Sequence, residues 1–276
     1  MRAVIPQNPT VVLTGGASGL GRAFALELAA RRARIVLADI DEAGLEETRK
    51  QVEARGGSAK TVRCDVSKLA EVKRLHDEAS TWLGGDVDLL VNNAGVAVGG
   101  SVGEIPIEDW EWITGINQWG PIYGCHVFLP AMKRRGRGHV LNVASIAAFA
   151  CAGEMGPYNV TKAAVVALTE TLAGELAGTG VGASVLCPFF FSTNIAKNAR
   201  SASATVQPES IERLMKRTPV QANDVARLAL EACERDQLYV FPHREAKGIA
   251  ALKRLVPETF LRRLSPMVAK RASPKL

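Results

Sequence analysis

The sequence holds few residues from which a metal site or a disulfide framework could be built. Its five cysteines lie far apart, include no Cys-x-x-Cys pair, and are odd in number, which argues against a complete set of disulfides. The four histidines at positions 76, 126, 139 and 243 show no spacing typical of metal ligands. We therefore expect reduced thiols in a cytoplasmic protein, no bound metal, and histidines that are ordinary core or surface residues.

Long apolar runs are also missing. No run reaches the ~18 residues that a membrane-spanning helix needs. The opening Met-Arg-Ala-Val-Ile-Pro is too short, and too soon interrupted, for a secretory signal. Hydrophobic residues nevertheless make up 47% of the 276 residues, which is enough for the large core of one α/β unit.

Acidic residues are scarce only near the C-terminus. Residues 243–276 contain nine Lys or Arg and two Glu, a net charge of +7, whereas the whole chain carries +6. The first 242 residues are thus nearly neutral, and we expect no nucleic-acid partner. The predicted organisation is a dinucleotide-binding catalytic domain over residues 1–242 and a basic amphipathic helical tail over residues 243–276.

Short runs of β-branched residues alternate with longer helical patterns throughout the body. Strands that alternate with helices pair in parallel through right-handed crossovers. The expected fold is α/β, a Rossmann-like, doubly wound seven-stranded parallel sheet in a three-layer α/β/α arrangement with a C-terminal helical extension. The seven predicted strands are residues 10–14, 34–39, 59–64, 87–91, 139–143, 181–186 and 238–241, and the clearest helices are residues 21–32 and 42–55.

The first predicted strand runs into a glycine-rich turn that includes Gly15, Gly19 and Gly21, and a helix follows. Glycines at such a turn let the backbone approach a pyrophosphate, and the helix N-terminus stabilises its charge. Asp39 closes the second strand, where a carboxylate would accept hydrogen bonds from the adenosine ribose. This pattern predicts an NAD site. The alternative is a tight turn followed by a surface Asp.

Polar residues follow the next two predicted strands. Asp65 comes directly after the third strand, and Asn92, Asn93 and Gly95 follow the fourth. Ligands of open parallel sheets bind at the carboxyl ends of the strands, so these residues are candidates for cofactor contacts. Asn and Gly also form simple turns, and we expect a structural role for Asn92. Asn117 falls within a predicted long helix, where most Asn residues face solvent.

Tyr158 and Lys162 lie four residues apart in a run of strong helix formers, so their side chains share one helix face. A tyrosine hydroxyl, with a pKa of ~10, is a poor base near neutrality unless a cation such as Lys162 stabilises the phenolate. Ser145, at the end of an apolar run, could complete a site that polarises a carbonyl oxygen. This arrangement predicts proton exchange with an alcohol or ketone. The alternative is an amphipathic pair at a helix surface.

Together, these residues resemble the short-chain dehydrogenase/reductase family, in its single-domain oxidoreductase branch, over about residues 8–242. They occur in the family's order and approximate spacing. The positions that carry the resemblance are Thr14, Gly15, Gly19, Gly21, Asp65, Asn92, Asn93, Ala94, Gly95, Asn117, Ser145, Tyr158 and Lys162.

The resemblance implies a role for each catalytic position. Tyr158 would be the general acid/base, and Lys162 would hold the nicotinamide ribose and lower the pKa of Tyr158. Ser145 would bind the substrate oxygen, and Asn117 would hold a water that links Lys162 to a proton relay. The expected cofactor contacts are Gly15, Ser18, Gly19, Leu20, Asp39, Asp65, Val66, Asn93, Tyr158, Lys162 and Thr193.

Two segments depart from the family's pattern. Phe189 follows Pro188 where the family usually has glycine, which places bulk beside the nicotinamide. A long basic tail replaces the family's glycine-rich ending. We therefore expect a homo-oligomer, for which a dimer is at least as plausible as a tetramer.

The predicted activity is hydride transfer between NAD and a small-molecule secondary alcohol or ketone. The apolar residues Ile146, Phe149, Met155 and Phe189 favour a hydrophobic or aromatic substrate, although such residues also build ordinary cores. One alternative is a non-catalytic dinucleotide sensor. Another is a dehydrogenase of lipid-like or steroid-like alcohols attached to a membrane through its tail.

The tail repeats apolar residues at helical spacing. Ile249, Leu252, Leu255 and Val256 fall on one helix face, and the pattern resumes after Pro257 at positions 260, 261, 264, 267 and 268. We expect these helices to dock on the body or on a second subunit. The surrounding Lys and Arg side chains also fit the alternative of a helix lying on an anionic membrane.

Overall fold

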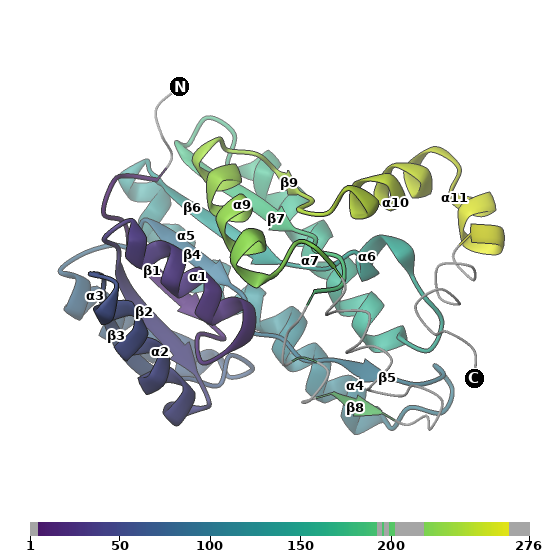
Figure 1. Ribbon diagram of the computed structural model, residues 1–276, viewed down its shortest axis with the longest axis horizontal. Coiled ribbons are helices and arrows are strands. Elements are labelled where there is room, and N and C mark those ends of the chain that lie inside the picture. The colour runs from purple at the N-terminus through teal and green to yellow at the C-terminus, as the bar shows by residue number, and fades with distance from the viewer. Residues whose placement is uncertain (1–4, 192–194, 196–198, 202–217, 265–276) are drawn as a thin grey trace.

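The computed structural model describes residues 5–191, 195, 199–201 and 218–264. Its centre is a seven-stranded parallel sheet with the strand order β3-β2-β1-β4-β6-β7-β9, which confirms the predicted fold (Figure 1). The order reverses between β1 and β4. Ligands of doubly wound sheets bind at this reversal, outside the carboxyl ends of the strands.

The strands coincide with the predicted apolar runs to within a few residues. β1, β2, β4, β6 and β7 are buried along nearly their whole length, as expected of parallel strands covered on both faces. Their bounds are β1 Thr10–Thr14, β2 Arg34–Asp39, β3 Ser58–Arg63, β4 Leu89–Asn92, β6 Gly138–Val143, β7 Val181–Leu186 and β9 Tyr239–Val240.

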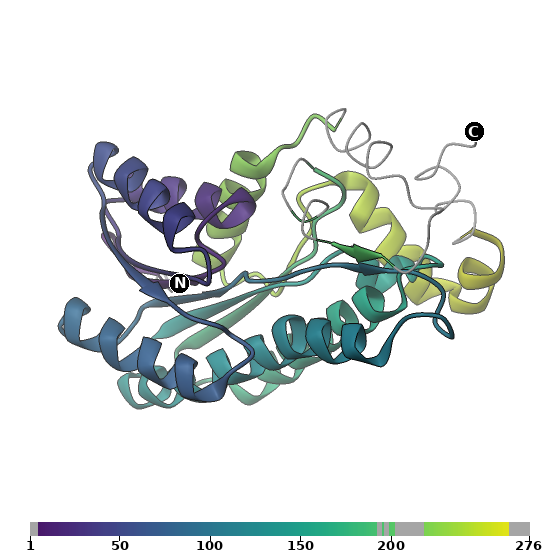
Figure 2. The same ribbon diagram turned by 90° about the horizontal axis from the view of Figure 1, so that it is seen from below.

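Helices cover both faces of the sheet (Figure 2). α1 Gly19–Ala30, α2 Glu42–Ala54 and α9 Ala222–Glu234 pack on one face through a core that includes Phe24, Leu45 and Leu230. The other face is covered by α3 Leu69–Leu83, α5 Gly120–Arg135 and α7 Gly156–Glu175. The remaining helical segments are α4 Ile107–Thr114, the π-helix η1 Gly115–Trp119, α6 Ala147–Ala150, α10 Arg244–Leu255, α11 Pro257–Thr259 and the π-helix η3 Phe260–Leu264.

A second, two-stranded sheet lies apart from the main one and was not predicted (Figure 1). It pairs β5, Val98–Gly99, in parallel with β8, Arg200–Ser201. Strands of two residues carry no periodicity that a sequence pattern could reveal.

The first part of the tail docks on the body through small residues. Ala246 and Ala250 of α10 are buried against the cluster around α6, where Ile249 packs at the edge, and Phe260 is also buried. Two basic side chains take part in the docking. Lys253 Nζ donates to Ala148 O at 3.2 Å, and Arg254 forms an ion pair with Glu170 at 3.0 Å.

The expected apolar stripe of the tail is therefore only partly covered. Small alanine side chains let the α10 backbone approach α6 closely, which turns the larger residues outward. Leu252, Leu255, Val256 and Leu261 are 44%, 78%, 43% and 42% exposed. Residues 265–276, with the last predicted apolar positions, lie outside the described residues.

Candidate active site

The glycine-rich turn between β1 and α1 has no room for side chains. Gly15 and Gly19 adopt positive φ angles of 67° and 53°. A Cβ atom on Gly21 would lie 1.8 Å from the Gly15 carbonyl oxygen, so α1 can start this close to the turn only with glycine there. Ser18 is the N-cap residue of α1, and the side chain of Leu20 is buried.

Asn93 holds this turn from the neighbouring strand. Its Nδ2 atom donates to the carbonyl oxygens of Thr14 at 2.9 Å and Gly15 at 3.1 Å. The backbone N–H groups of Asn93 and Ala94 donate to Thr14 Oγ1 at 3.0 and 3.2 Å. Asn92 points the other way, and its Nδ2 donates to Asn142 Oδ1 at 2.8 Å in the core. These bonds agree with the structural role expected for Asn92.

Asp39 ends β2 beside the turn. Its Oδ2 accepts a hydrogen bond from Ala17 N at 3.1 Å, and its Oδ1 accepts from Ile40 N at 2.7 Å. The carboxylate is half-buried, and Ile40 next to it is 63% exposed. An exposed isoleucine at this edge offers an apolar surface to a planar ring, a role that the sequence pattern did not suggest.

Arg22, on α1, forms hydrogen bonds within the protein beside the glycine-rich turn. This side chain is half-buried. Its NH2 group donates to Ala17 O at 2.7 Å and its Nε to Thr48 Oγ1 at 3.0 Å. Thr48 lies on α2, out of reach of any local sequence pattern.

Asp65 and Val66 follow β3 at the same edge of the sheet. Asp65 Oδ1 accepts from Ser67 Oγ at 2.6 Å, and Lys68 lies 3.2 Å from Oδ2. Partial burial raises the pKa of Asp65, but the bonds from Ser67 and Lys68 outweigh it and hold the pKa below its usual value. Val66 is buried against Gly120 at the start of α5.

Asn117 lies in η1, which joins α4 and α5 into one continuous helix. Its side chain is fully buried and clamps the peptide of Val96: Oδ1 accepts from Val96 N, and Nδ2 donates to Val96 O, both at 2.9 Å. Nδ2 also lies 3.3 Å from Thr161 Oγ1 on α7. π-helical turns occur frequently at functional sites. Asn117 is thus a buried link between two site segments, unlike most asparagines within helices, which face solvent.

Tyr158 and Lys162 occupy the first two turns of α7, with Tyr158 half-buried. Burial raises the pKa of Tyr158, and the nearby Ser145 hydroxyl opposes that rise. Ser145 Oγ also accepts from Ala147 N at 3.1 Å, which fixes the hydroxyl at the end of β6. The serine and tyrosine hydroxyls therefore face one another, as a site for a carbonyl oxygen requires.

Lys162 is buried, and its Nζ donates to Val143 O at 2.9 Å. Burial lowers the pKa of Lys162 to about 8, although the Cys187 thiol opposes this shift. The ammonium lies 5.7 Å from the centre of the Tyr158 ring. This arrangement differs from the expected lowering of the Tyr158 pKa by Lys162, because the ammonium is directed at a backbone carbonyl of β6 and lies over the ring.

Gly95 brings Asn117 and Lys162 together. A Cβ atom on this residue would lie 3.3 Å from both Asn117 Oδ1 and Lys162 Nζ. The site residues contributed by β4, η1, β6 and α7 thus meet at one point at the carboxyl edge of the sheet. Thr193, the remaining predicted cofactor contact, lies outside the described residues.

The predicted substrate pocket is partly core. Ile146 and Phe149 are buried in the cluster with Val165 and Val185, and Phe149 packs edge-on against Phe241 at 5.8 Å. Met155 and Phe189 are half-buried and stay candidates for substrate contact.

Phe189, which follows Pro188, is held by His243, the first residue of the tail. The backbone N–H of Phe189 donates to His243 Nδ1 at 3.2 Å, and His243 is buried beneath it. His243 also lies 3.4 Å from Val220 O, so one imidazole joins the segment after β7 to the segment before α9. This link explains how the structure accommodates phenylalanine where the family usually has glycine.

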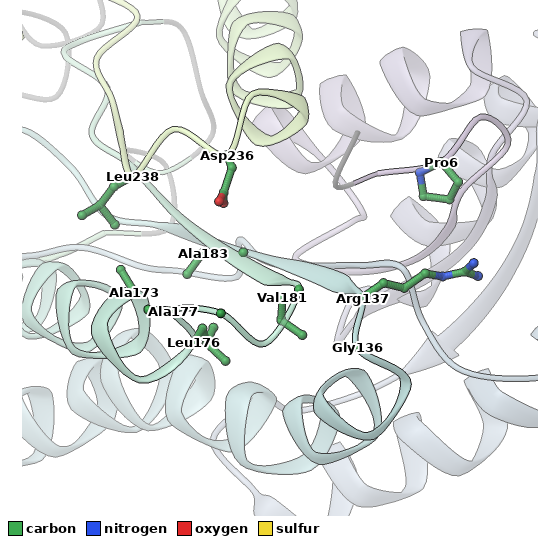
Figure 3. Close-up of a pocket in the computed structure, with 13 residues that line it drawn as sticks. Pro6, Gly136, Arg137, Ala173, Leu176, Ala177, Val181, Ala183, Asp236 and Leu238 are labelled. Atoms are coloured by element: carbon green, nitrogen blue, oxygen red, sulfur yellow. The ribbon is translucent and has the colours of Figure 1, made fainter. Parts of the chain in front are cut away.

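A cavity of about 760 Å³ lies away from these residues, where β7 begins (Figure 3). Arg137, Val181, Ala183 and Asp236 line it, and it contains none of the predicted site residues. The candidate site is therefore identified by its place at the carboxyl edge of the sheet and not by the volume of a cavity.

Residues at the sheet reversal fit a bound dinucleotide. An α-helix leaves its first N–H groups without intrahelical acceptors, and at α1 the glycines leave these groups open to a pyrophosphate. Asp39 stands one strand away, where the adenosine ribose would lie.

All five cysteines lie in the described part of the chain and none forms a disulfide. Among the described residues no group of His, Cys, Asp and Glu could hold a metal. No described helix is long and apolar enough to cross a membrane.

The fold, the glycine turn and the Ser–Tyr–Lys site define a dinucleotide-dependent oxidoreductase. The family model for short chain dehydrogenase matches residues 9–204, and the chain belongs to this family. It is 33% identical to 1-deoxy-11-beta-hydroxypentalenate dehydrogenase of Streptomyces exfoliatus over 244 residues, which cover 87% of this chain and 85% of that protein.

Solved structures agree with this assignment. A short chain dehydrogenase/reductase from Burkholderia phymatum in complex with NAD shares 37% identity and a TM-score of 0.85, covering 94% of this chain and 96% of that one. A short-chain dehydrogenase from Sphingobium yanoikuyae in complex with NADPH shares 25% identity and a TM-score of 0.74, covering 88% and 91%.

Proposed function

We propose that the protein is an NAD-dependent alcohol dehydrogenase or ketone reductase with Tyr158 as the general acid/base. The observation that carries this proposal is the placement of Ser145 near Tyr158, with the buried Lys162 one helical turn further along α7. A non-catalytic dinucleotide sensor would need no such proton-transfer tyrosine.

Each residue has a distinct task in the proposed reaction. When bound, the nicotinamide supplies the hydride chemistry. Ser145 holds the substrate oxygen, and Tyr158 exchanges a proton with it. Lys162, with a pKa of about 8, stays mostly protonated near pH 7 and would hold the nicotinamide ribose. Asn117 would hold the water of the proton relay while its side chain keeps Val96 in place.

The proposed preference for NAD depends on Asp39. Its carboxylate lies where the 2′-phosphate of NADP would come, and Arg22, a nearby cation, is turned toward Ala17 and Thr48. Both cofactors occur among the similar structures, since the Burkholderia phymatum protein is in complex with NAD and the Sphingobium yanoikuyae protein with NADPH. The position of Asp39 favours NAD for this chain.

The proposed substrate is a hydrophobic or aromatic secondary alcohol, or its ketone. Met155 and Phe189 are half-buried, and Val98, Ile113 and the aromatic rings of α4 form an apolar cluster with Tyr158. The Streptomyces exfoliatus relative is named as a dehydrogenase of a hydroxy compound.

The test is to assay purified protein with NAD and a panel of cyclohexanol, 1-phenylethanol and 1-indanol, following absorbance of the reduced nicotinamide. Tyr158→Phe should lower kcat by ~10²-fold to 10⁴-fold and leave the Kd for NAD nearly unchanged. Tyr123→Phe is the matched control, because Tyr123 stacks on Trp119 and packs in a different apolar cluster from Tyr158. Near-normal turnover by Tyr158→Phe would contradict the mechanism. Binding of NAD without turnover of any alcohol or ketone would favour the sensor.

We also propose a homo-oligomer, either a dimer or a tetramer. An apolar groove between α5 and α7 fits a second copy of the chain. Its lining residues are Ile122, Cys125, His126, Leu129, Pro130, Lys133 and Leu172. Light scattering on the wild type and on Leu129→Glu should show a larger mass for the wild type, and a monomeric wild type would contradict this assignment.

The exposed end of the tail supports a peripheral membrane contact as a second proposal. Leu255 is the most exposed large hydrophobic side chain in the described part of the chain, and Leu252 and Leu261 accompany it. Pairing two tails would bring together two segments of net charge +7, whereas an anionic lipid surface attracts them at ~1 kcal/mol per basic residue. Sedimentation with phosphatidylserine vesicles should be lost in Leu255→Asp. No sedimentation of the wild type would contradict the contact.

A further inference from the structure

Arg200 belongs to the connection between β7 and α9 and docks on α4. Its guanidinium forms an ion pair with Asp109 at 2.8 Å and lies over the Trp112 ring, with Cζ 3.9 Å from the ring centre. Its backbone N–H donates to Ala97 O at 3.1 Å and begins the pairing of β8 with β5. One side chain thus fastens this segment to a helix that precedes it by about 90 residues in the sequence.

The β5–β8 sheet leads directly to the catalytic residues. Asn117 clamps Val96 just before β5, and just after it Gly100 N donates to Glu154 O at 2.7 Å. Glu154 lies immediately before α7, whose first turn carries Tyr158. The sheet is therefore connected at one end to η1 and at the other to the helix that presents the general acid/base.

Trp112 gives a second link between Arg200 and the site. It packs with Val98 and Ile113 in the small apolar cluster that Tyr158 also contacts. The adenosine and pyrophosphate side of the cofactor edge is separate from this cluster, because Gly15, Asn93 and Asp39 lie at the reversal of the main sheet. A change at Arg200 can therefore reach the substrate side without altering the contacts expected for the adenosine and the pyrophosphate.

We propose that Arg200 is a positioning residue that holds the β5–β8 sheet as the substrate-side wall of the site. By its ion pair and its stacking on Trp112 it keeps this wall against α4, so that the carbon skeleton of the substrate meets a preformed surface. This inference rests on the proposed function. It places the effect of Arg200 on substrate binding and not on NAD binding or proton transfer.

The experiment compares Arg200→Gln with the wild type, using 1-phenylethanol, or the best alcohol of the panel, and NAD. An exposed ion pair and a cation–π contact together correspond to about 1 to 2 kcal/mol, so KM for the alcohol should rise about 5-fold to 30-fold. The value of kcat should change less than about twofold, and the Kd for NAD, measured by calorimetry, should not change. Arg200→Lys keeps the charge but not the planar stacking, and should give an intermediate KM.

Arg227→Gln is the matched control. Arg227 forms an ion pair with Glu231 at 2.9 Å, and its side chain is 46% exposed against 47% for Arg200, but it lies on α9. Its loss should leave KM unaltered. If Arg200→Gln does not fold, Asp109→Asn removes the same ion pair from the other side and should raise KM while leaving NAD binding intact.

The outcomes separate the two proposals. A wild type that binds NAD but turns over no alcohol or ketone contradicts the proposed function. An active wild type whose KM is unchanged in both Arg200→Gln and Asp109→Asn contradicts the role of Arg200 alone. An equal loss of NAD affinity in these variants would also overturn it, because the residue would then support the fold in general.

Discussion

Replacing Asp39 by Asn removes a negative charge from the end of β2 and nearly preserves the shape of the side chain. The amide oxygen can still accept from Ile40 N, as Asp39 Oδ1 does at 2.7 Å. The amide nitrogen cannot accept from Ala17 N, which Oδ2 does at 3.1 Å. We therefore expect a loss of about 1 kcal/mol in the binding of either cofactor, and a separate change in the preference between them.

The magnitude of the change in preference follows from Coulomb's law. Two unit charges at ~4 Å repel by about 1 kcal/mol in water and by about 4 kcal/mol at an effective dielectric constant of ~20. Asp39 is half-buried, so the true value lies between these limits. The ratio of kcat/KM for NAD to that for NADP should fall by roughly 5-fold to several hundredfold in Asp39→Asn.

The assay measures kcat/KM for both cofactors at one saturating alcohol concentration in the wild type and two variants. Asp41→Asn is the control, because it removes the same charge two residues later from a side chain that caps α2 through Gly44 N at 3.0 Å. Its ratio should change by less than about twofold. An unchanged ratio in Asp39→Asn, or equal changes in both variants, would refute the contact between Asp39 and the adenosine ribose.

Two further predictions concern stability. Gly21→Ala places a Cβ atom 1.8 Å from Gly15 O, so it should abolish NAD binding in calorimetry and destabilise the fold by about 3 kcal/mol or more. Its control is Gly174→Ala, which has no atom within 4 Å of the added Cβ and should stabilise α7 by ~0.5 to 1 kcal/mol. A Gly21→Ala protein that binds NAD normally would contradict the close approach of the two backbones. Burial lowers the pKa of His139 to about 3 from 6.5, so the unfolded chain binds a proton first as the pH falls. Between pH 7.5 and 5 in urea titrations, His139 should therefore cost the wild type about 2 kcal/mol that His139→Gln does not lose; equal losses would contradict this assignment.

Several features of the site could be predicted because their signals are local. The glycine spacing after β1 reports a turn that must approach another backbone, and Asp39 follows from its place at a strand end. Tyr158 and Lys162 share a helix face because of the period of the α-helix. The positions of these residues at one edge follow from the parallel pairing of strands.

The contacts that orient these side chains could not be predicted in the same way. Lys162 donates to a carbonyl of β6, Asn117 clamps Val96 from a π-helix, and Arg22 is turned toward α2. Each partner lies about 20 or more residues away in the sequence, so no local periodicity encodes it. The β5–β8 pairing could not be predicted either, because its strands are two residues long and about 100 residues apart in the sequence.

The sequence alone therefore determined the alternation of strands and helices, the glycine turn and the shared helix face of Tyr158 and Lys162, since each depends on residue types at short, regular spacing. Only the tertiary structure decided which face of the tail docks. Sequence periodicity marked Leu252, Leu255 and Val256, but the close approach of α10 to α6 requires the small side chains of Ala246 and Ala250. A hydrophobic pattern reports which residues can be buried, and the space that the neighbouring element leaves decides which of them are.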